Sequence, residues 1–204
     1  MKFLASVLTI AASVTLLPAS LAQMSGGNAK LALNSSAEAQ AGGQLNDGVA
    51  RAKKPLLSPP AQATVQLNEK QVTIDYNTPL MRGRKIFGGL VPYDKVWRTG
   101  ANPATTLKTE TDLKIGAATV PAGTYTLYTL PSETTWKLII NKQTGQWGTV
   151  YTESQDLARV DMRKDALPRP QEKMSISFEK TQGNRTQLHV RWDTTDVWVP
   201  VVAQ

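Results

Sequence analysis

The chain has 204 residues, no cysteine, one histidine and a formal net charge of +7 at neutral pH. This length allows one domain of ordinary size with an additional segment. The lack of cysteine excludes disulfides, thiolate metal sites and a cysteine nucleophile, so the domain must be stabilised by its core alone.

The first 22 residues have the organisation of a secretory signal peptide. Lys2 precedes an uncharged, mostly apolar run over residues 3–17, and Ser20 and Ala22 are small residues where a signal peptidase would read them. The run is shorter than the ~20 residues that a membrane-spanning helix needs. We therefore expect cleavage after Ala22, no transmembrane segment after signal removal, and a periplasmic or secreted protein.

Residues 23–57 differ from the rest of the chain in composition. They are rich in Ala, Gly, Asn, Gln and Ser and show no sustained apolar period. Such a segment buries too little apolar surface to fold by itself. We predict a flexible tether over residues 23–57, followed by one domain over residues 58–204.

That domain reads as short segments of alternating apolar and polar residues separated by turn signals, which is typical of β-strands. The clearest segments are residues 63–67, 72–76, 104–109, 112–115, 124–130, 136–140, 174–178, 188–192 and 197–201, with weaker candidates at 147–151 and 157–162. Pro168 and Pro170 indicate a connection, and Thr195 with Asp196 indicates a turn. Strands with one apolar face must pack that face on another sheet. The sequence predicts an all-β fold, a two-sheet antiparallel β-sandwich, with a partly closed β-barrel as the alternative.

Residues 79–102 do not alternate, and we predict a long irregular loop there. The stretch contains five cations, three aromatic residues and four glycines. Its net charge of +4 equals that of the whole segment 61–204, so the basic character of the domain is local. This argues against a nucleic-acid partner and favours an anionic or carbohydrate ligand, bound by charge and stacking.

Eight residues are the candidates for such a ligand site. They are Arg84, Lys85, Tyr93, Lys95, Trp97, Arg98 and Asn102 in the loop, and Trp147 in a later one. Because neighbours in an extended segment point to opposite sides, we expect Trp97 to face the core and Arg98 to face outward. A second interpretation stays open, in which the aromatic residues only plug one end of the fold, and the two interpretations are compatible.

Catalytic patterns are weak. His189 is the single imidazole, and its alternating neighbours predict an exposed position on the polar face of a strand. No nucleophile elbow, phosphate loop or metal-binding spacing is present. We therefore predict no metal site and no cofactor, and we assign no catalytic residue.

Several long motifs resemble a known family. They are GRKIFGGLVPY at residues 83–93, KVWRTGAN at 95–102, PAGTY at 121–125, and NK at 141–142 with TGQWG at 144–148. Over about residues 58–202 the chain closely resembles the bacterial family filed as domain of unknown function 2911. The resemblance implies an exported, β-rich protein. It implies no activity, cofactor or catalytic residue.

Taken together, these features favour a non-enzymatic module that binds a ligand or partner through residues 79–102. A hydrolase of envelope or extracellular polymers, and a structural envelope protein that assembles through a sheet edge, remain as alternatives.

Overall fold

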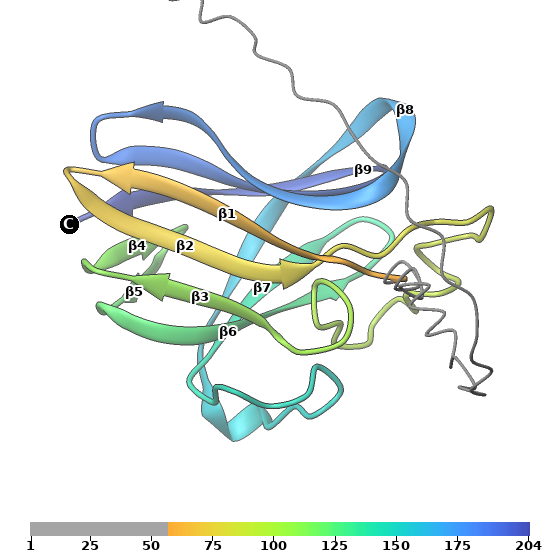
Figure 1. Cartoon of the computed structure of the whole chain (residues 1–204), viewed down its shortest axis with the longest axis horizontal. Coiled ribbons are helices and arrows are strands. Elements are labelled where there is room, and N and C mark those ends of the chain that lie inside the picture. The colour runs from red at the N-terminus through yellow and green to blue at the C-terminus, as the bar shows by residue number, and fades with distance from the viewer. Residues whose placement is uncertain (1–56) are drawn as a thin grey trace, which may run out of the picture. The chain divides into compact units, whose positions relative to one another are not determined.

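A computed structural model describes residues 57–204, the coloured part of Figure 1. The predicted signal peptide, and all of the predicted tether except Leu57, lie outside the described residues. Within the described range, no helix combines the length and the apolar character that crossing a bilayer would need.

Nine strands and one turn of 3₁₀ helix make up this part of the chain. In order, they are β1 (Pro60–Leu67), β2 (Lys70–Asn77), β3 (Thr105–Thr109), β4 (Leu113–Ile115), β5 (Ala118–Val120), β6 (Gly123–Pro131), β7 (Trp136–Asn141), the 3₁₀ turn η1 (Glu153–Gln155), β8 (Asp156–Gln182) and β9 (Arg185–Ala203). Every strand pairing is antiparallel. The predicted all-β antiparallel class is confirmed.

All nine strands belong to one sheet, in the order β1-β2-β3-β6-β7-β8-β9-β4-β5. The first part of β8 pairs with β7, and the rest of it pairs with β9. The sheet is not closed into a barrel, because β1 and β5 are its two edges. The division into two separate sheets, which the sandwich prediction requires, is not confirmed.

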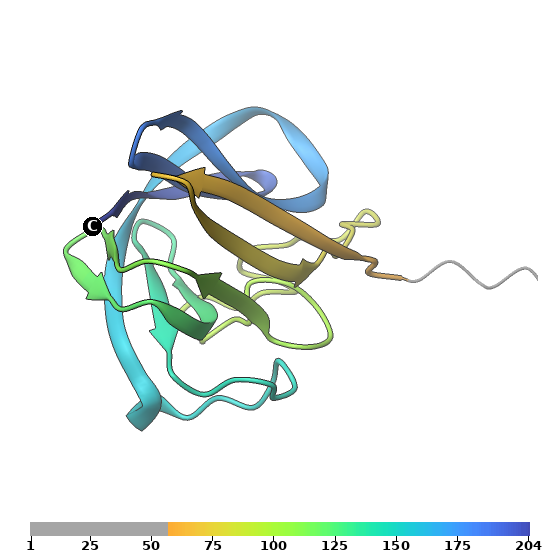
Figure 2. The same ribbon diagram turned by 60° about the vertical axis from the view of Figure 1, so that its left-hand side comes forward.

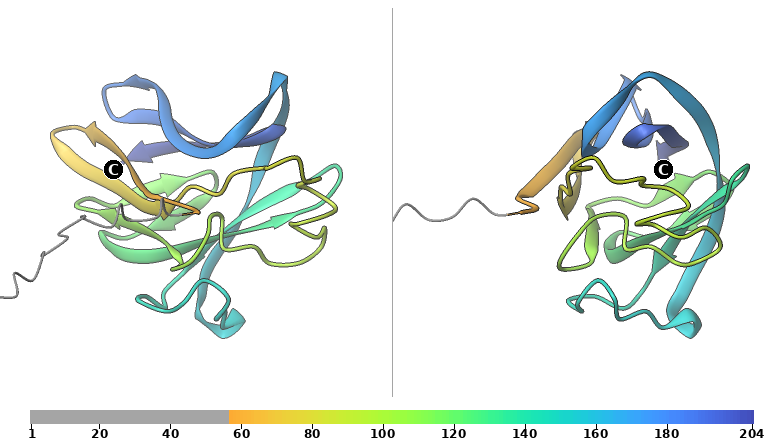
Figure 3. Two further views of the ribbon diagram at one scale, coloured as in Figure 1. Left: turned by 45° about the vertical axis from the view of Figure 1, so that its right-hand side comes forward. Right: turned by 90° about the vertical axis from the view of Figure 1, so that its right-hand side faces the viewer.

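The sheet is strongly curved. Figures 2 and 3 show β8 arching over the domain, so that it and β9 lie against the β1–β2 hairpin. The apolar residues inside this curve form a single buried cluster to which all nine strands contribute. A buried polar contact across this cluster joins β2 to β8. The Tyr76 hydroxyl of β2 accepts from the Ile176 N–H (3.1 Å) and donates to the Ile176 carbonyl (3.2 Å) of β8.

β1 and β2 form a hairpin from the two strands predicted at residues 63–67 and 72–76. Val65 faces Val72, and the turn residues Asn68 and Glu69 have φ values of 49° and 63°. Two positive φ values in a two-residue turn are the geometry that matches the right-handed twist of the flanking strands. The two strands predicted from alternation on either side of this turn are confirmed.

β8 continues through Pro168 and Pro170, where the sequence predicted a connection. Its pairing with β9 is interrupted between Ala166 and Gln171, and both prolines lie inside that interruption. A proline cannot donate to a strand ladder but is tolerated at a bulge. The predicted connection was therefore wrong, because the prolines interrupt the ladder without ending the strand.

β9 likewise continues through Thr195 and Asp196, where a turn was predicted. The chain bends slightly earlier, at Asp193, which has a φ of 53°. Thr195 still pairs with Ala166 and Asp196 with Asp165 of β8. The predicted turn is instead a bend within one long strand.

Candidate functional site

Residues 79–102 run from the end of β2 to the start of β3, and the backbone of β6 and β8 holds them in place. Trp97 exchanges two backbone hydrogen bonds with Thr129 of β6 (2.8 and 2.9 Å). Before that, Met81 donates to the Glu172 carbonyl (2.9 Å), and Pro79 accepts from Met174 (3.0 Å). The predicted irregular loop is therefore anchored at both of its ends.

The anchoring at β8 also protects a sheet edge. In its second half, β8 pairs with β9 on one side only. Residues 79–81 and the Tyr76 hydroxyl supply partners for β8 backbone groups on the other side. Covering exposed backbone groups is how native sheets avoid pairing with other chains.

Four aromatic rings gather where the loop meets the core. Trp97 stacks on Trp192 of β9 with ring centroids 5.9 Å apart and planes 18° apart. Phe87 lies edge-on to Trp97 (6.1 Å), Trp136 (4.9 Å) and Trp192 (6.2 Å). Such edge-on and stacked pairs add to the stability gained from apolar burial. Trp97 therefore packs against the core.

The turn from Lys85 to Val91 needs glycine at one position for reasons of space. A side chain on Gly89 would begin 2.5 Å from the Lys85 carbonyl oxygen, which is backbone and cannot move aside easily. This turn brings Ile86, Phe87 and Val91 into the core while Leu90 stays 45% exposed. Gly89 thus allows the tight turn in which three apolar side chains are buried while the Leu90 side chain stays exposed.

A hollow of about 350 Å³ opens between this loop, the start of β1 and the Trp192 side chain. Its lining consists of Leu57, Ser58, Pro79, Arg84, Leu90, Val91, Trp97, Arg98, Gly100, Ala101, Asn102 and Trp192. We call it the Arg98 hollow. Among residues 57–204, no carboxylate or imidazole lines it, and the charged groups in its lining are the guanidinium groups of Arg84 and Arg98.

Arg98 has no ion-pair partner among residues 57–204. The residue is partly buried, and its Nε is a buried nitrogen that finds no hydrogen-bond acceptor within the described part of the chain. An unsatisfied buried donor costs free energy, more so when it is charged. A ligand acceptor at this position would remove that cost.

Arg84, by contrast, is held by the loop itself. Its Nε donates to the Met81 carbonyl (2.9 Å), and its Nη2 donates to the Leu80 carbonyl (2.7 Å). These bonds use two of the five guanidinium N–H groups and fix the side chain. Arg84 therefore supplies positive charge in a set position, whereas Arg98 supplies unused donors.

The segment from Gln146 to Gly148 packs on the other side of Arg98. Gly148 donates to the Asn102 carbonyl (3.1 Å), and Trp147 and Pro103 form an isolated antiparallel bridge. A side chain on Gly148 would begin 2.7 Å from the Asn102 carbonyl oxygen and would collide with the Arg98 stem. The absence of a side chain at Gly148 is what lets this second loop confine Arg98.

The eight predicted site residues thus fall into three groups. Arg84, Trp97, Arg98 and Asn102 line the Arg98 hollow together. Lys85 and Tyr93 line a separate hollow of about 470 Å³, beside Asp193 and the middle of β8. Lys95 is exposed and lines neither, while Trp147 is 55% exposed and lies next to the first hollow through its bridge to Pro103.

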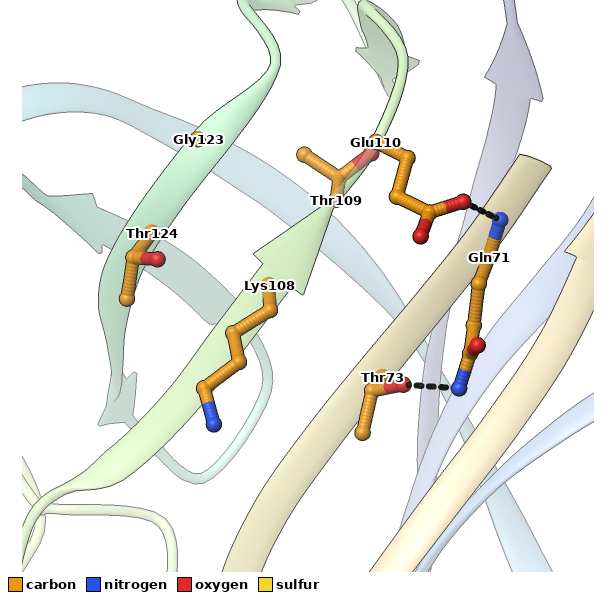
Figure 4. A pocket seen from close by; sticks show the side chains of 7 residues that line it. All are labelled: Gln71, Thr73, Lys108, Thr109, Glu110, Gly123 and Thr124. Carbon is orange, nitrogen blue, oxygen red and sulfur yellow. Dashed lines mark hydrogen bonds between the residues drawn. The ribbon is translucent and has the colours of Figure 1, made fainter.

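Figure 4 shows a third hollow, on the outer face of β2, β3 and β6. It is lined by Gln71, Thr73, Lys108, Thr109, Glu110, Gly123 and Thr124. Its charges already have partners, since Glu110 accepts from the Gln71 N–H (2.8 Å) and Lys108 pairs with Asp75 (3.0 Å). None of the predicted site residues lines it.

The expected exposed position of His189 was wrong, because only 4% of the residue is exposed. Its Nδ1 lies 2.9 Å from Asp196, whose other oxygen accepts from the Arg191 Nε (2.8 Å). The Trp198 ring stacks on the imidazole at 5.8 Å. The bend at Asp193 brings residues seven positions apart in β9 together, which strict alternation does not predict.

Glu179 of β8 completes this polar cluster through a two-pronged ion pair with Arg191. The guanidinium hydrogen bonds lower the pKa of Glu179, and the same pair raises the pKa of Arg191. Every charged group in the cluster has a partner, which is typical of a structural network rather than a ligand site. The described residues also contain no group of three histidine, aspartate or glutamate side chains arranged to hold a metal ion.

A family model described as "Protein of unknown function (DUF2911)" matches residues 58–201. The chain belongs to this family. The resemblance noted from the loop motifs is confirmed, and nearly the whole of the described domain is included. Neither the curated proteins nor the solved structures give a significant match.

Three of the motifs that carry the DUF2911 resemblance, at residues 83–93, 95–102 and 144–148, build or adjoin the Arg98 hollow. Residues 83–93 and 95–102 supply most of its lining, and residues 144–148 pack behind Arg98. The cluster around His189, in contrast, lies outside these motifs, and sequence reasoning missed it.

Proposed function

We propose that this DUF2911 protein is a non-enzymatic binding module that takes the acidic group of a ligand, a carboxylate or a phosphate, into the Arg98 hollow. The observation that carries the proposal is the partly buried Arg98, whose Nε has no acceptor and which has no counter-ion in the described domain. A guanidinium matches the paired oxygens of such groups better than any other side chain.

The chemistry of the hollow supports binding over hydrolysis. Hydrolysis of a glycosidic bond needs two positioned carboxylates, and acyl transfer needs a nucleophile with a base. The described residues that line the Arg98 hollow include neither a carboxylate nor an imidazole. The two guanidinium groups would hold an acid in place without a group to transfer its proton.

Two broader expectations accompany this proposal. We propose that the protein acts in the periplasm or outside the cell, on the strength of the predicted signal peptide. We also propose that the sheet forms the two layers of a sandwich. One layer consists of β1, β2, β3, β6 and β7, the other consists of β9, β4 and β5, and β8 joins them. This is supported by the shared core between them.

The proposal is tested with pairs of probes in which a carboxylate is replaced by a neutral hydroxymethyl group. Benzoate is compared with benzyl alcohol, and glucuronate with glucose, by titration calorimetry. We expect at least one acid to bind about 10-fold or more tightly than its neutral counterpart, and Arg98→Gln to abolish that preference. Because the contacts are charged, the affinity of the acid should also fall as salt is raised.

Arg185→Gln is the matched control, since it removes one arginine at the turn between β8 and β9. Figure 1 places that turn at the opposite end of the domain from the loop of residues 79–102. Equal binding of acids and neutral counterparts, or the same loss of affinity in both arginine variants, contradicts the proposal.

A further inference from the structure

Large apolar side chains are exposed at the mouth of the Arg98 hollow. Among residues 57–204, four large hydrophobic residues are mostly exposed, namely Leu57 (62%), Trp147 (55%), Val150 (47%) and Leu90 (45%). Leu57 and Leu90 line the hollow, and Trp147 is bridged to Pro103, next to Asn102 in the lining. Single exposed apolar residues are ordinary, but a group of them around one hollow marks a binding surface.

The inside of the hollow is also apolar apart from its cations. Val91, Trp97, Ala101 and Trp192 contribute buried or partly buried apolar surface. The neutral polar groups are few, and the Asn102 side-chain amide already donates to the Ser58 carbonyl (3.4 Å). A ligand rich in hydroxyl groups would lose water here without finding enough replacement partners.

From this combination we infer that the natural ligand is a small amphiphile, with an acidic head group at Arg98 and an apolar chain that lies over Leu90 and Leu57 toward Trp147. The inference rests on the proposed function and narrows its ligand class. Charge complementarity places the head, since Arg98 is the group that lacks a partner. The exposed rim then covers the apolar chain of the ligand, so affinity rises with each methylene group that becomes buried.

The size of the hollow is compatible with a ligand that has an acidic head and an apolar chain. Its volume of about 350 Å³ is near the lower end of the range for small-molecule sites, so it has room for an acidic head and a chain of several methylene groups. The rest of the chain would lie on the rim. The buried position of the Arg98 Nε also requires the head to enter the protein, which a monomeric ligand does more readily than a lipid held in a bilayer.

The test is a chain-length series on the purified protein. Acetate, butyrate and octanoate are titrated below the concentrations at which octanoate self-associates, with octanol as the neutral counterpart. Tryptophan fluorescence is a suitable signal because Trp97 and Trp192 line the hollow. We expect affinity to rise about 10-fold or more from butyrate to octanoate, and octanol to bind about 10-fold or more weakly than octanoate.

Substitutions on the rim of the hollow test where the apolar chain of the ligand lies. Leu90→Ser should lower the affinity for octanoate about 3-fold or more and leave butyrate binding unchanged. Val150→Ser removes an equally exposed side chain that does not line the hollow, so it should change neither affinity. Thermal unfolding of both variants verifies that each is folded.

The possible results separate the two proposals. If acids bind with no dependence on chain length, the amphiphile is wrong and the proposed function stands. If octanol binds as well as octanoate, the role of Arg98 and therefore the proposed function are wrong. If no acid in the series binds while benzoate or glucuronate does, the amphiphile is wrong and the proposed function stands, and if those two acids also fail to bind, both proposals are wrong. If the protein binds vesicles of phosphatidylglycerol and octanoate does not compete, the site recognises a membrane surface, and the inference of a monomeric ligand is overturned.

Discussion

Trp97 and Arg98 are adjacent in the chain and have different surroundings. Trp97 packs on Trp192 and Phe87, whereas Arg98 has its stem against Gly148 and its Nε without a partner. The sequence predicted an inward Trp97 and an outward Arg98. Trp97 does pack inward, but both side chains also line the same hollow, because the segment bends at Thr99 (φ 53°) and Asn102 (φ 61°). Alternation alone cannot describe such a segment.

Loss of the Trp97 ring should be costly. Trp97→Ala removes a stacked and an edge-on aromatic contact from the core, and we expect the free energy of unfolding to fall by about 3 kcal/mol. Trp147→Ala is the control and should change it by no more than about 0.5 kcal/mol, because that side chain is 55% exposed. Urea unfolding measures both, and equal effects would show that Trp97 does not anchor the loop.

Acid should weaken the fold partly through Glu179. Its pKa is lowered because Arg191 donates hydrogen bonds to its carboxylate, with a hydrogen bond from Ser177 and the charge of Arg191 adding to the effect. A lowered pKa stabilises the fold at pH values above the unfolded-state pKa of about 4.3, and this contribution is lost as pH falls toward the pKa of the folded state.

Glu179→Gln should therefore destabilise the protein at pH 7 and make its stability less sensitive to pH below about 4.5. Glu133→Gln alters an exposed carboxylate with no ion-pair partner among the described residues and should leave the pH profile unchanged. Urea midpoints measured across this pH range would contradict the account if the Glu179 variant kept the slope of the unmodified protein.

At the scale of elements, two loops from different parts of the chain meet at Arg98. The loop after β2 supplies the arginine, and the loop after β7 supplies Gly148, whose N–H donates to the Asn102 carbonyl. The sequence pointed to both loops through their glycines and tryptophans. It gave no sign that they touch, because their contact depends on the pairing of β3, β6 and β7 between them.

Gly148→Ala tests this contact. The added methyl group would begin 2.7 Å from the Asn102 carbonyl and would press on the Arg98 stem. We expect the free energy of unfolding to fall by about 1–3 kcal/mol and octanoate binding to weaken along with it. Gly183→Ala, in the open turn between β8 and β9, is the control. It introduces a strained φ but should leave binding unchanged, and weaker binding in both variants would show that the effect is not local.

The long strands explain where prediction from the sequence succeeded and failed. Short strands such as β2 and β7 were predicted because each has a regular alternation between two turn signals. β8 and β9 were divided into pieces, since prolines and polar pairs resemble turns when only local pattern is considered. Whether such residues end a strand or sit in a bulge depends on the partner strand, which local sequence does not specify.

At the scale of the whole molecule, local sequence likewise predicts the composition of the site and not its geometry. Its composition was visible, because the cations and aromatic residues of 79–102 stand out against the alternating strands. Its geometry was not, because the hollow also needs Trp192 from the other end of the chain and Leu57 before the first strand. The sequence predicted one ligand surface, whereas the structure has two hollows here, one lined by Arg98 and one lined by Lys85 and Tyr93.

The domain offers one measurement that reports on the unused Arg98 donor itself. In proton–nitrogen NMR spectra, the side-chain Nε–H of each arginine gives a separate signal, and Arg98→Gln and Arg185→Gln assign the two signals of interest. On titration with octanoate, the account predicts a large, saturating shift of the Arg98 signal and no shift of the Arg185 signal, with the same dissociation constant as in calorimetry. Binding of octanoate that leaves the Arg98 signal in place would contradict the central claim that this guanidinium receives the acidic group.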